Sequence, residues 1–123
     1  FISQHMISEA TEAVKDTGAA TAAIPMTDTL KLSEDAGLSV KLTIQRDKIW
    51  AAQTPQIFSV DMLKRAHANP PISDFSDDSS LIEASGIKVK IFSGSTQNIK
   101  ITFPADLKIA SAILKSLNNR TNQ

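Results

Sequence analysis

Lys100 is the side chain of this sequence that most suggests chemistry with an anion. It stands between Ile99 and Ile101, close to a polar loop and to the start of a predicted helix. An ammonium group in that position faces either solvent or a cleft, and a solvated lysine is the more frequent case. Arg46 presents a similar choice beside Trp50, because its guanidinium can hold a phosphate bidentately or lie along the indole face. Both cations are therefore candidate anion ligands whose surroundings must decide their role.

Thr54 is a candidate hydroxyl donor within "WAAQTPQIF", where two glutamines flank it and a proline follows. Threonine hydroxyls commonly cap turns, and the alternative role is a fixed donor to a phosphate or sugar oxygen. Asp77 and Asp78 precede a predicted helix, and aspartates in that position most often cap the helix. Adjacent carboxylates can also hold a magnesium ion or a sugar hydroxyl. His5 and His67 have no metal-binding spacing, so we expect both at the surface.

Several common catalytic signatures are absent from the sequence. There is no cysteine, which excludes a disulfide framework, a thiolate nucleophile and a cysteine-ligated metal. No glycine-rich phosphate loop, serine elbow, zinc spacing or dinucleotide fingerprint occurs. Thirteen basic and thirteen acidic residues cancel, so no broad positive field attracts nucleic acid or an anionic membrane. Any bound anion must be held locally.

The 123 residues, 41% of them hydrophobic, suffice for one core, so we expect one domain over residues 1–123. No stretch approaches the roughly 20 apolar residues that span a bilayer, and no signal peptide is visible, which favours a soluble intracellular protein. Because the chain starts with Phe1 and enters a predicted helix within three residues, we expect an upstream segment.

Helical and strand patterns alternate along the chain. Alternating or uninterrupted apolar residues predict a hairpin over about residues 29–45 and strands over residues 19–26, 87–92 and 99–103. Apolar residues at helical spacing, bounded by capping or breaking residues, predict helices over residues 3–18, 59–69, 77–86 and 104–117. Residues 51–54 carry no strong period of either kind.

Helices that alternate with strands imply an α/β sheet with helices packed on its faces, and the hairpin is the part that does not fit this scheme. In an open α/β sheet, ligands collect outside the carboxyl ends of the strands. We therefore expect chemistry at the loops and strand ends that carry Thr27, Asp28, Thr29, Ser76 and Lys100.

Four blocks of the sequence resemble the carboxyl-terminal half of 2-C-methyl-D-erythritol 4-phosphate cytidylyltransferase, of the non-mevalonate isoprenoid pathway. They are "PMTDTLK" (25–31), "QRDKIWAAQTPQIF" (45–58), "SDDSSLIEASG" (76–86) and "NIKITFPADL" (98–107). Their order and spacing make the resemblance specific, whereas each block alone is weak. The resemblance implies part of a Rossmann-like nucleotidyltransferase sheet with helices on its faces, and a β-hairpin arm projecting at about residues 28–50.

The resemblance implies that a phosphate oxygen of methylerythritol phosphate attacks the α-phosphate of CTP and that pyrophosphate leaves, assisted by Mg²⁺. Such a reaction needs charge neutralisation and alignment more than a covalent nucleophile. By position, Thr54 and Lys100 resemble the catalytic hydroxyl and ammonium. Thr29 and Arg46 resemble arm residues that grip the substrate phosphate from the neighbouring subunit, while Ser76 stands where the family has threonine and keeps the hydroxyl.

The resemblance also implies a homodimer joined through the β-arm, in the bacterial cytoplasm or the plastid stroma, with no nucleic-acid or membrane partner. Trp50 and Phe58 would be packing anchors. The family's amino-terminal half, with its glycine-rich CTP loop, has no counterpart in the 123 residues, so we expect this chain alone to be inactive. Two alternatives stay open: a cytidylyltransferase for a pentitol phosphate such as ribitol 5-phosphate, and a non-catalytic dimerisation module.

Overall fold

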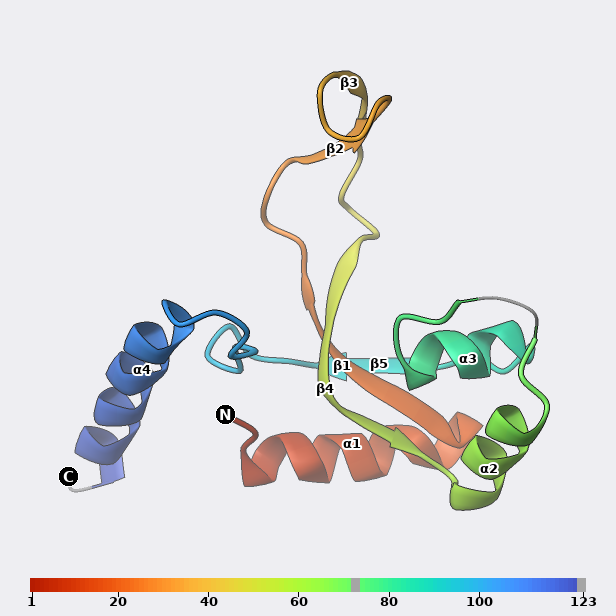
Figure 1. The fold of residues 1–123 in the computed structure, drawn as a ribbon. Helices are drawn as coiled ribbons and strands as arrows, with labels where there is room; N and C mark the ends of the chain where they lie inside the picture. Colours follow the sequence, from red (N-terminus) through yellow and green to blue (C-terminus); the bar gives the residue numbers. More distant parts are fainter. Residues whose placement is uncertain (72–73, 122–123) are drawn as a thin grey trace.

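The computed structural model describes residues 1–71 and 74–121, drawn as a ribbon in Figure 1. Its elements, in chain order, are α1 (Gln4–Thr17), β1 (Ala19–Pro25), β2 (Leu30–Ser33), β3 (Val40–Ile44), β4 (Trp50–Phe58), α2 (Val60–Ala68), α3 (Asp78–Ala84), β5 (Lys90–Ser93) and α4 (Asp106–Thr121). This mixture of helices with parallel and antiparallel strands confirms the predicted α/β class.

Strand β1 is the centre of a three-stranded sheet in the order β4-β1-β5. It pairs antiparallel with β4 and parallel with β5. Although alanine is a poor strand former, the alanines of β1 are almost completely buried. Alternate residues point to opposite faces of a strand, so Ala20 and Ala22 pack toward one helical layer while Ala19 packs toward another.

Helix α1 covers the first of these faces. The Ser3 hydroxyl accepts a hydrogen bond from the Met6 N–H at 3.1 Å, which caps the amino end of the helix. Gly18 ends it with φ of 78°, a left-handed conformation that glycine adopts without penalty. Met6, Ala10 and Ala13 then pack against Ala20, Ala22 and Phe92. Local capping signals therefore place α1 where the sequence predicted it.

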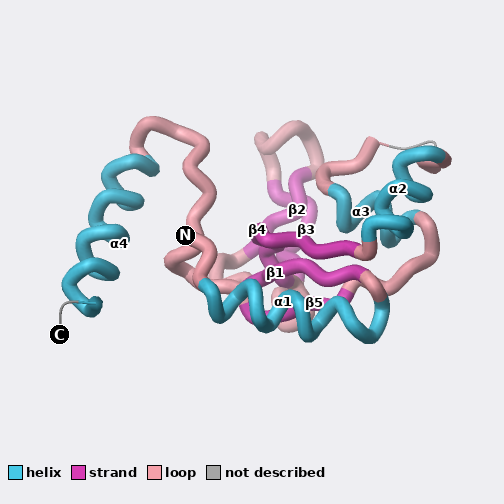
Figure 2. Tube along the Cα trace, turned by 90° about the horizontal axis from the view of Figure 1, so that it is seen from below, coloured by secondary structure: helices cyan, strands magenta, loops and turns pink. Residues whose placement is uncertain are grey.

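Helices α2 and α3 lie side by side at the opposite side of the sheet, as Figures 1 and 2 show. Their core contains Ala66, Leu81 and the fully buried Ile82, packed with Ala19. Phe58 packs against this cluster, as expected of an anchor. Trp50 leaves 44% of its surface exposed in this chain and is not part of either buried cluster, so its predicted role as a packing anchor stays a prediction.

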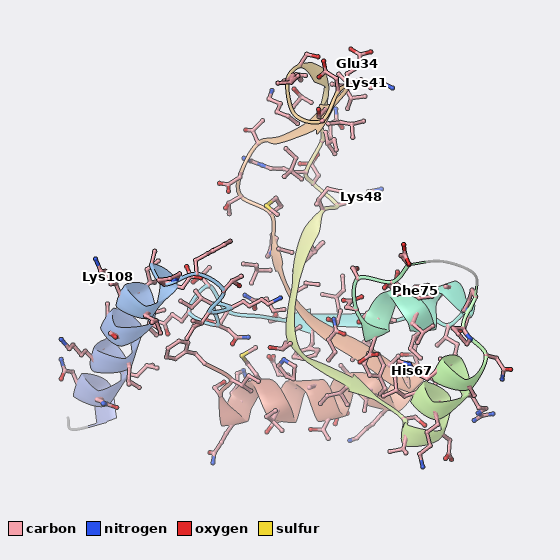
Figure 3. The ribbon with its side chains drawn as sticks, viewed as in Figure 1. Glu34, Lys41, Lys48, His67, Phe75 and Lys108 are labelled. Atoms are coloured by element: carbon pink, nitrogen blue, oxygen red, sulfur yellow. The ribbon has the colours of Figure 1, made fainter. Side chains whose placement is uncertain are left out.

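Strands β2 and β3 form a separate two-stranded sheet that projects away from the body of the molecule (Figure 1). Leu30 pairs with Ile44 at its base, which confirms the hairpin predicted from alternating residues. Glu34 and Lys41 lie at its far end in Figure 3. At the tip, an Asp35 carboxylate oxygen accepts from the Ser39 N–H at 2.7 Å and from the Ser39 hydroxyl at 2.8 Å.

Two predicted strands need correction. Residues 99–103 are not a strand, because no strand in the described part of the chain pairs with them and alternation alone supplies no hydrogen-bond ladder. The strand predicted over residues 87–92 is β5, which begins only at Lys90. Its buried side chain is Phe92, while Ile91 is 46% exposed, because α1 covers the face to which Phe92 points.

Helix α4 stands apart from the other helices in Figures 1 and 2. A carboxylate oxygen of Asp106 accepts from the backbone N–H groups of Phe103 and Thr102, both at 2.8 Å, and these bonds lower the pKa of Asp106. Ala110 is buried, whereas Leu107 and Leu114 are more than half exposed. The described helices include none with the length and apolar character required to cross a membrane.

Candidate functional site

Three of the predicted site residues line one open pocket beside β4. Thr54, Ser76 and Lys100 all border this pocket, whose volume is about 770 Å³. They come from β4, from the loop before α3 and from the segment between β5 and α4. The other lining residues are Ala51, Ala52, Gln53, Gln56, Asp77, Asp78, Asn98 and Ile99. The fold thus brings together residues that are distant in the sequence.

Thr54 lies in a bulge of β4. Thr21 of β1 pairs with Gln56, and the next residue, Ala22, pairs with Gln53, so Thr54 and Pro55 have no partner in the ladder. Pro55 has no N–H to donate and is tolerated because β4 is at an edge of the described sheet. A bulge redirects side chains, and Thr54 is exposed at the pocket. The bulge also explains why the sequence shows no strand period here.

The two glutamines around Thr54 connect β4 to the other two walls of the pocket. Gln53 Nε2 donates to the Ser95 carbonyl at 2.9 Å and to the Asn98 carbonyl at 3.3 Å. Gln56 Nε2 donates to Asp77 Oδ2 at 2.6 Å. These roles were not predicted from the sequence, in which the only local signal was the pair of amide side chains that flank Thr54 and Pro55.

Asp77 is the N-cap of α3. Its Oδ1 accepts from the Ser80 N–H at 2.9 Å, and its own N–H donates to the Ser80 hydroxyl, which completes a capping box. Burial opposes the charged form of Asp77, but the hydrogen bonds from Gln56 and Ser80 outweigh burial and hold the pKa of this carboxyl below its usual value. Asp77 therefore keeps its charge beside Ser76 at the pocket wall.

Asp78 and His67 form an exposed pair between α3 and α2. His67 Nε2 lies 2.9 Å from Asp78 Oδ1, and Figure 3 shows His67 on α2 facing α3. His5 is exposed as well and lies near Glu9. The predicted surface positions of both histidines are confirmed.

Lys100 is the cation of the pocket. It is exposed, and within residues 1–71 and 74–121 its ammonium has no hydrogen-bond or ion-pair partner. An ammonium without a carboxylate partner keeps its full charge available to a bound phosphate. The structure thus places Lys100 both at solvent and at the pocket, which were the two positions that its sequence context allowed.

Thr29 and Arg46 do not line this pocket. Both are exposed where the projecting hairpin joins the body, and Arg46 Nη1 donates to the backbone carbonyl of Thr27. The structure therefore does not bring them to Thr54 and Lys100 of the same chain. Their predicted role from a neighbouring subunit stays a prediction.

The pocket does not contain a complete metal-binding set. Among the described residues, no group of three or more histidine, aspartate or glutamate side chains could hold a metal ion. Of the two carboxylates at the pocket, Asp77 accepts from Gln56 and Ser80, and Asp78 contacts His67. The described residues therefore do not fit a self-contained divalent-ion site.

A second pocket, of about 640 Å³, lies between the start of α1 and the loop after β5. Its lining includes Glu9 and His5 but neither lysine nor arginine. A doubly charged phosphate group is better matched by the pocket with Lys100, because that pocket supplies a permanent positive charge and a hydroxyl donor.

Known proteins resemble this chain over nearly its whole length. The family model for 2-C-methyl-D-erythritol 4-phosphate cytidylyltransferase matches residues 1–116. Enzymes of that name from Bacillus licheniformis and Alkaliphilus oremlandii are 43% and 44% identical over 118 residues, which make up 94% of this chain and 50% of each relative. The chain thus spans about half the length of the curated relatives it matches.

Solved structures also match most of this chain with about half of their own length. The crystal structure of 2-C-methyl-D-erythritol 4-phosphate cytidylyltransferase from Thermus thermophilus matches with a TM-score of 0.80 and 32% identity, over 94% of this chain and 57% of that chain. The Francisella tularensis structure matches with a TM-score of 0.78 and 30% identity, over 91% and 54% of the two chains. This likeness confirms the predicted nucleotidyltransferase fold.

Proposed function

Because the chain belongs to the 2-C-methyl-D-erythritol 4-phosphate cytidylyltransferase family, we propose that its Lys100 pocket is the polyol-phosphate side of a cytidylyltransferase active site. In the proposed reaction, a phosphate oxygen of methylerythritol phosphate forms a bond to the α-phosphorus of CTP. The bond from that phosphorus to the bridging oxygen breaks, and pyrophosphate leaves. The observation that carries the proposal is the convergence of Thr54, Ser76 and Lys100 on one open pocket.

Each of these side chains supplies something that nucleotidyl transfer needs. Two phosphate groups that react with each other carry like charges, so the reaction requires neutralisation and alignment. The Lys100 ammonium, which has no carboxylate partner in the described part of the chain, offsets this charge. The Thr54 hydroxyl, presented by the bulge of β4, donates to a phosphate oxygen. Ser76 and the neighbouring Asp77 are suited to the hydroxyls of the polyol.

A divalent cation belongs to the proposal as well. Mg²⁺ is commonly held by one or two carboxylates together with substrate phosphates, and it supplies charge neutralisation. Since the described residues lack a metal-binding cluster, we assign its main ligands to the CTP phosphates and to residues outside this chain. The residues of this chain then bind and orient the polyol phosphate.

The projecting hairpin supports a homodimer. Leu38 and Val40 expose 88% and 59% of their surfaces on a hairpin that stands clear of the body (Figure 1). Apolar side chains gathered on a projecting element are typical of a protein interface. Thr29 and Arg46, at the base of the same hairpin and outside the pocket of their own chain, would contact the substrate phosphate in the pocket of the second subunit.

Pyrophosphate release from CTP tests the proposal in a full-length version of the protein that includes the amino-terminal half of the family. We expect release with methylerythritol phosphate, and much less with ribitol 5-phosphate. The opposite preference would favour a pentitol-phosphate cytidylyltransferase. Self-association without release with either substrate would favour a dimerisation module. The 123 residues alone are expected to release no pyrophosphate, so robust turnover by them would refute their dependence on the other half.

A further inference from the structure

The position of Lys100 depends on side-chain hydrogen bonds, because its segment belongs to no sheet in the described part of the chain. Strand β5 ends at Ser93, and α4 begins at Asp106. Between them, residues 94–105 include no strand. Backbone pairing with a neighbouring strand, which would ordinarily hold a residue in place, is therefore not what holds Lys100 near Thr54.

Gln53 binds the first part of this segment with both ends of its amide. Its Nε2 donates to the carbonyls of Ser95 and Asn98 at 2.9 and 3.3 Å, and its Oε1 accepts from the Ser95 N–H at 3.0 Å. A glutamine amide that uses its donors and its acceptor on one loop defines the orientation of that loop as well as its distance. Strand β4 thus holds residues 95–98 directly.

The approach of the loop to the sheet is close enough to require glycine. Gly94 N–H donates to the Ala23 carbonyl of β1 at 2.8 Å. A Cβ added at Gly94 would lie 2.3 Å from Gln53 Oε1 and 3.0 Å from the Ala23 carbonyl oxygen. Both distances are shorter than ordinary contacts, so the hydrogen bonds of Gln53 depend on a residue without a side chain at position 94.

Asn98 completes the connection at Thr54. It is only 7% exposed, and its Nδ2 donates to the Thr54 carbonyl at 2.5 Å. Thr54 lies in the bulge and has no ladder partner, so Asn98 satisfies a backbone acceptor that the sheet leaves open. Lys100 follows Asn98 by two residues, and the backbone that carries the ammonium is thereby joined to the backbone that carries the hydroxyl.

We infer that Gln53 and Asn98 are positioning residues that hold Lys100 in register with Thr54. The inference rests on the proposed function of the pocket, and it goes beyond that proposal by assigning a role to two amides whose hydrogen bonds join β4 to the segment that carries Lys100. A misplacement of about 1 Å can cost about 100-fold in rate, so a loop that is held by four side-chain hydrogen bonds is expected to matter for turnover.

Near-isosteric substitutions test the inference in the full-length protein. Gln53→Met and Asn98→Leu keep much of the side-chain volume but remove the amides. We expect each to lower kcat by about 10- to 100-fold, with faster hydrogen exchange of the backbone amides of residues 95–100. Gln97→Met is the matched control, because the Gln97 side chain makes no hydrogen bond to any residue that the structure describes, and only its backbone N–H donates to Ser95 Oγ. Unchanged kcat in both amide variants would overturn the inference.

A second measurement separates positioning from a general loss of structure. If Asn98 acts through Lys100, then Asn98→Leu added to Lys100→Met should lower kcat by less than about two-fold, because coupled residues do not act additively. A full additional loss in the double variant would contradict the inference.

The exchange measurement keeps this inference distinct from the proposed function. An unsubstituted full-length protein that releases no pyrophosphate would refute the proposed function. Hydrogen exchange would still test whether Gln53 and Asn98 hold residues 95–100 in place. Unchanged hydrogen exchange of the backbone amides of residues 95–100 in Gln53→Met and Asn98→Leu would overturn the inference, whether or not the protein turns over.

Discussion

Asp77→Ala is the substitution whose effect on stability follows most directly from the hydrogen bonds. Asp77 Oδ1 accepts from the Ser80 N–H at 2.9 Å, and Oδ2 accepts from Gln56 Nε2 at 2.6 Å. Loss of an N-cap costs about 1 kcal/mol, and loss of a side-chain hydrogen bond costs about 1 kcal/mol more. We therefore expect the free energy of unfolding to fall by about 2 kcal/mol.

Asp77→Asn separates these two contributions. Asparagine caps a helix about as well as aspartate, so this variant keeps the bond to Ser80 and loses the charge-assisted bond from Gln56. Its expected cost is about 1 kcal/mol, half that of the alanine variant. Asp78→Asn is the matched control, because Asp78 is the adjacent carboxylate and its side-chain oxygens have only the exposed His67 as a polar partner among the described residues. An exposed pair of that kind is worth about 0–1 kcal/mol.

Equilibrium urea unfolding of the full-length protein, followed by circular dichroism, measures all three variants. The expected order of cost is Asp77→Ala, then Asp77→Asn, then Asp78→Asn. Equal costs for the alanine and asparagine variants of Asp77 would show that Gln56 contributes nothing. A cost below about 0.5 kcal/mol for Asp77→Ala would show that neither bond stabilises α3.

Three further predictions concern pH, the loop and the core. The folded-state pKa of Asp77 is lowered, so its stabilisation is present above its ordinary pKa of about 3.9 and is lost as the pH falls through the lower folded value. The gap in unfolding free energy between the unsubstituted protein and Asp77→Asn should therefore narrow below about pH 4, and a constant gap from pH 7 to 3 would contradict this. Gly94→Ala should cost about 1–3 kcal/mol, because its Cβ would lie 3.0 Å from the Ala23 backbone oxygen and would displace the Gln53 amide, whose Oε1 lies 2.3 Å away; an unchanged melting temperature would be inconsistent with that close approach. Ile82→Ala should cost about 3 kcal/mol, since Ile82 is fully buried, whereas Ile109→Ala, at a position 53% exposed, should cost much less; similar melting temperatures would speak against the assigned core.

Local signals in the sequence predicted the elements that local chemistry determines. Helix α1 begins after Ser3 and ends at Gly18, as the sequence predicted, and Asp77 caps α3. The sequence did not predict β4, because the bulge at Thr54 and Pro55 interrupts the alternation that identifies a strand. Residues 99–103 show the converse case. Their apolar and polar residues alternate as in a strand, but no strand in the described part of the chain pairs with them.

The residues of the candidate site were predicted only in part. Thr54 and Lys100 were identified from their residue types and Ser76 from its loop position, and the family resemblance then assigned their roles. Their common pocket depends on strand pairing that no local pattern reveals. Gln53 and Asn98 were missed because their significance lies in their partners. Gln53 bonds to Ser95, 42 positions further along the chain, and nothing in "QTPQ" specifies that partner.

The most direct test of the central claim compares two lysines in the full-length protein. Lys100 lines the pocket, whereas Lys108 projects from α4 at the outer side of the molecule (Figure 3). We expect Lys100→Met to lower kcat/KM for pyrophosphate release with methylerythritol phosphate by about 100-fold or more, without a matching loss of stability. Lys108→Met should stay within about two-fold of the unsubstituted enzyme. Normal turnover by Lys100→Met would contradict the assignment of this pocket as the substrate site.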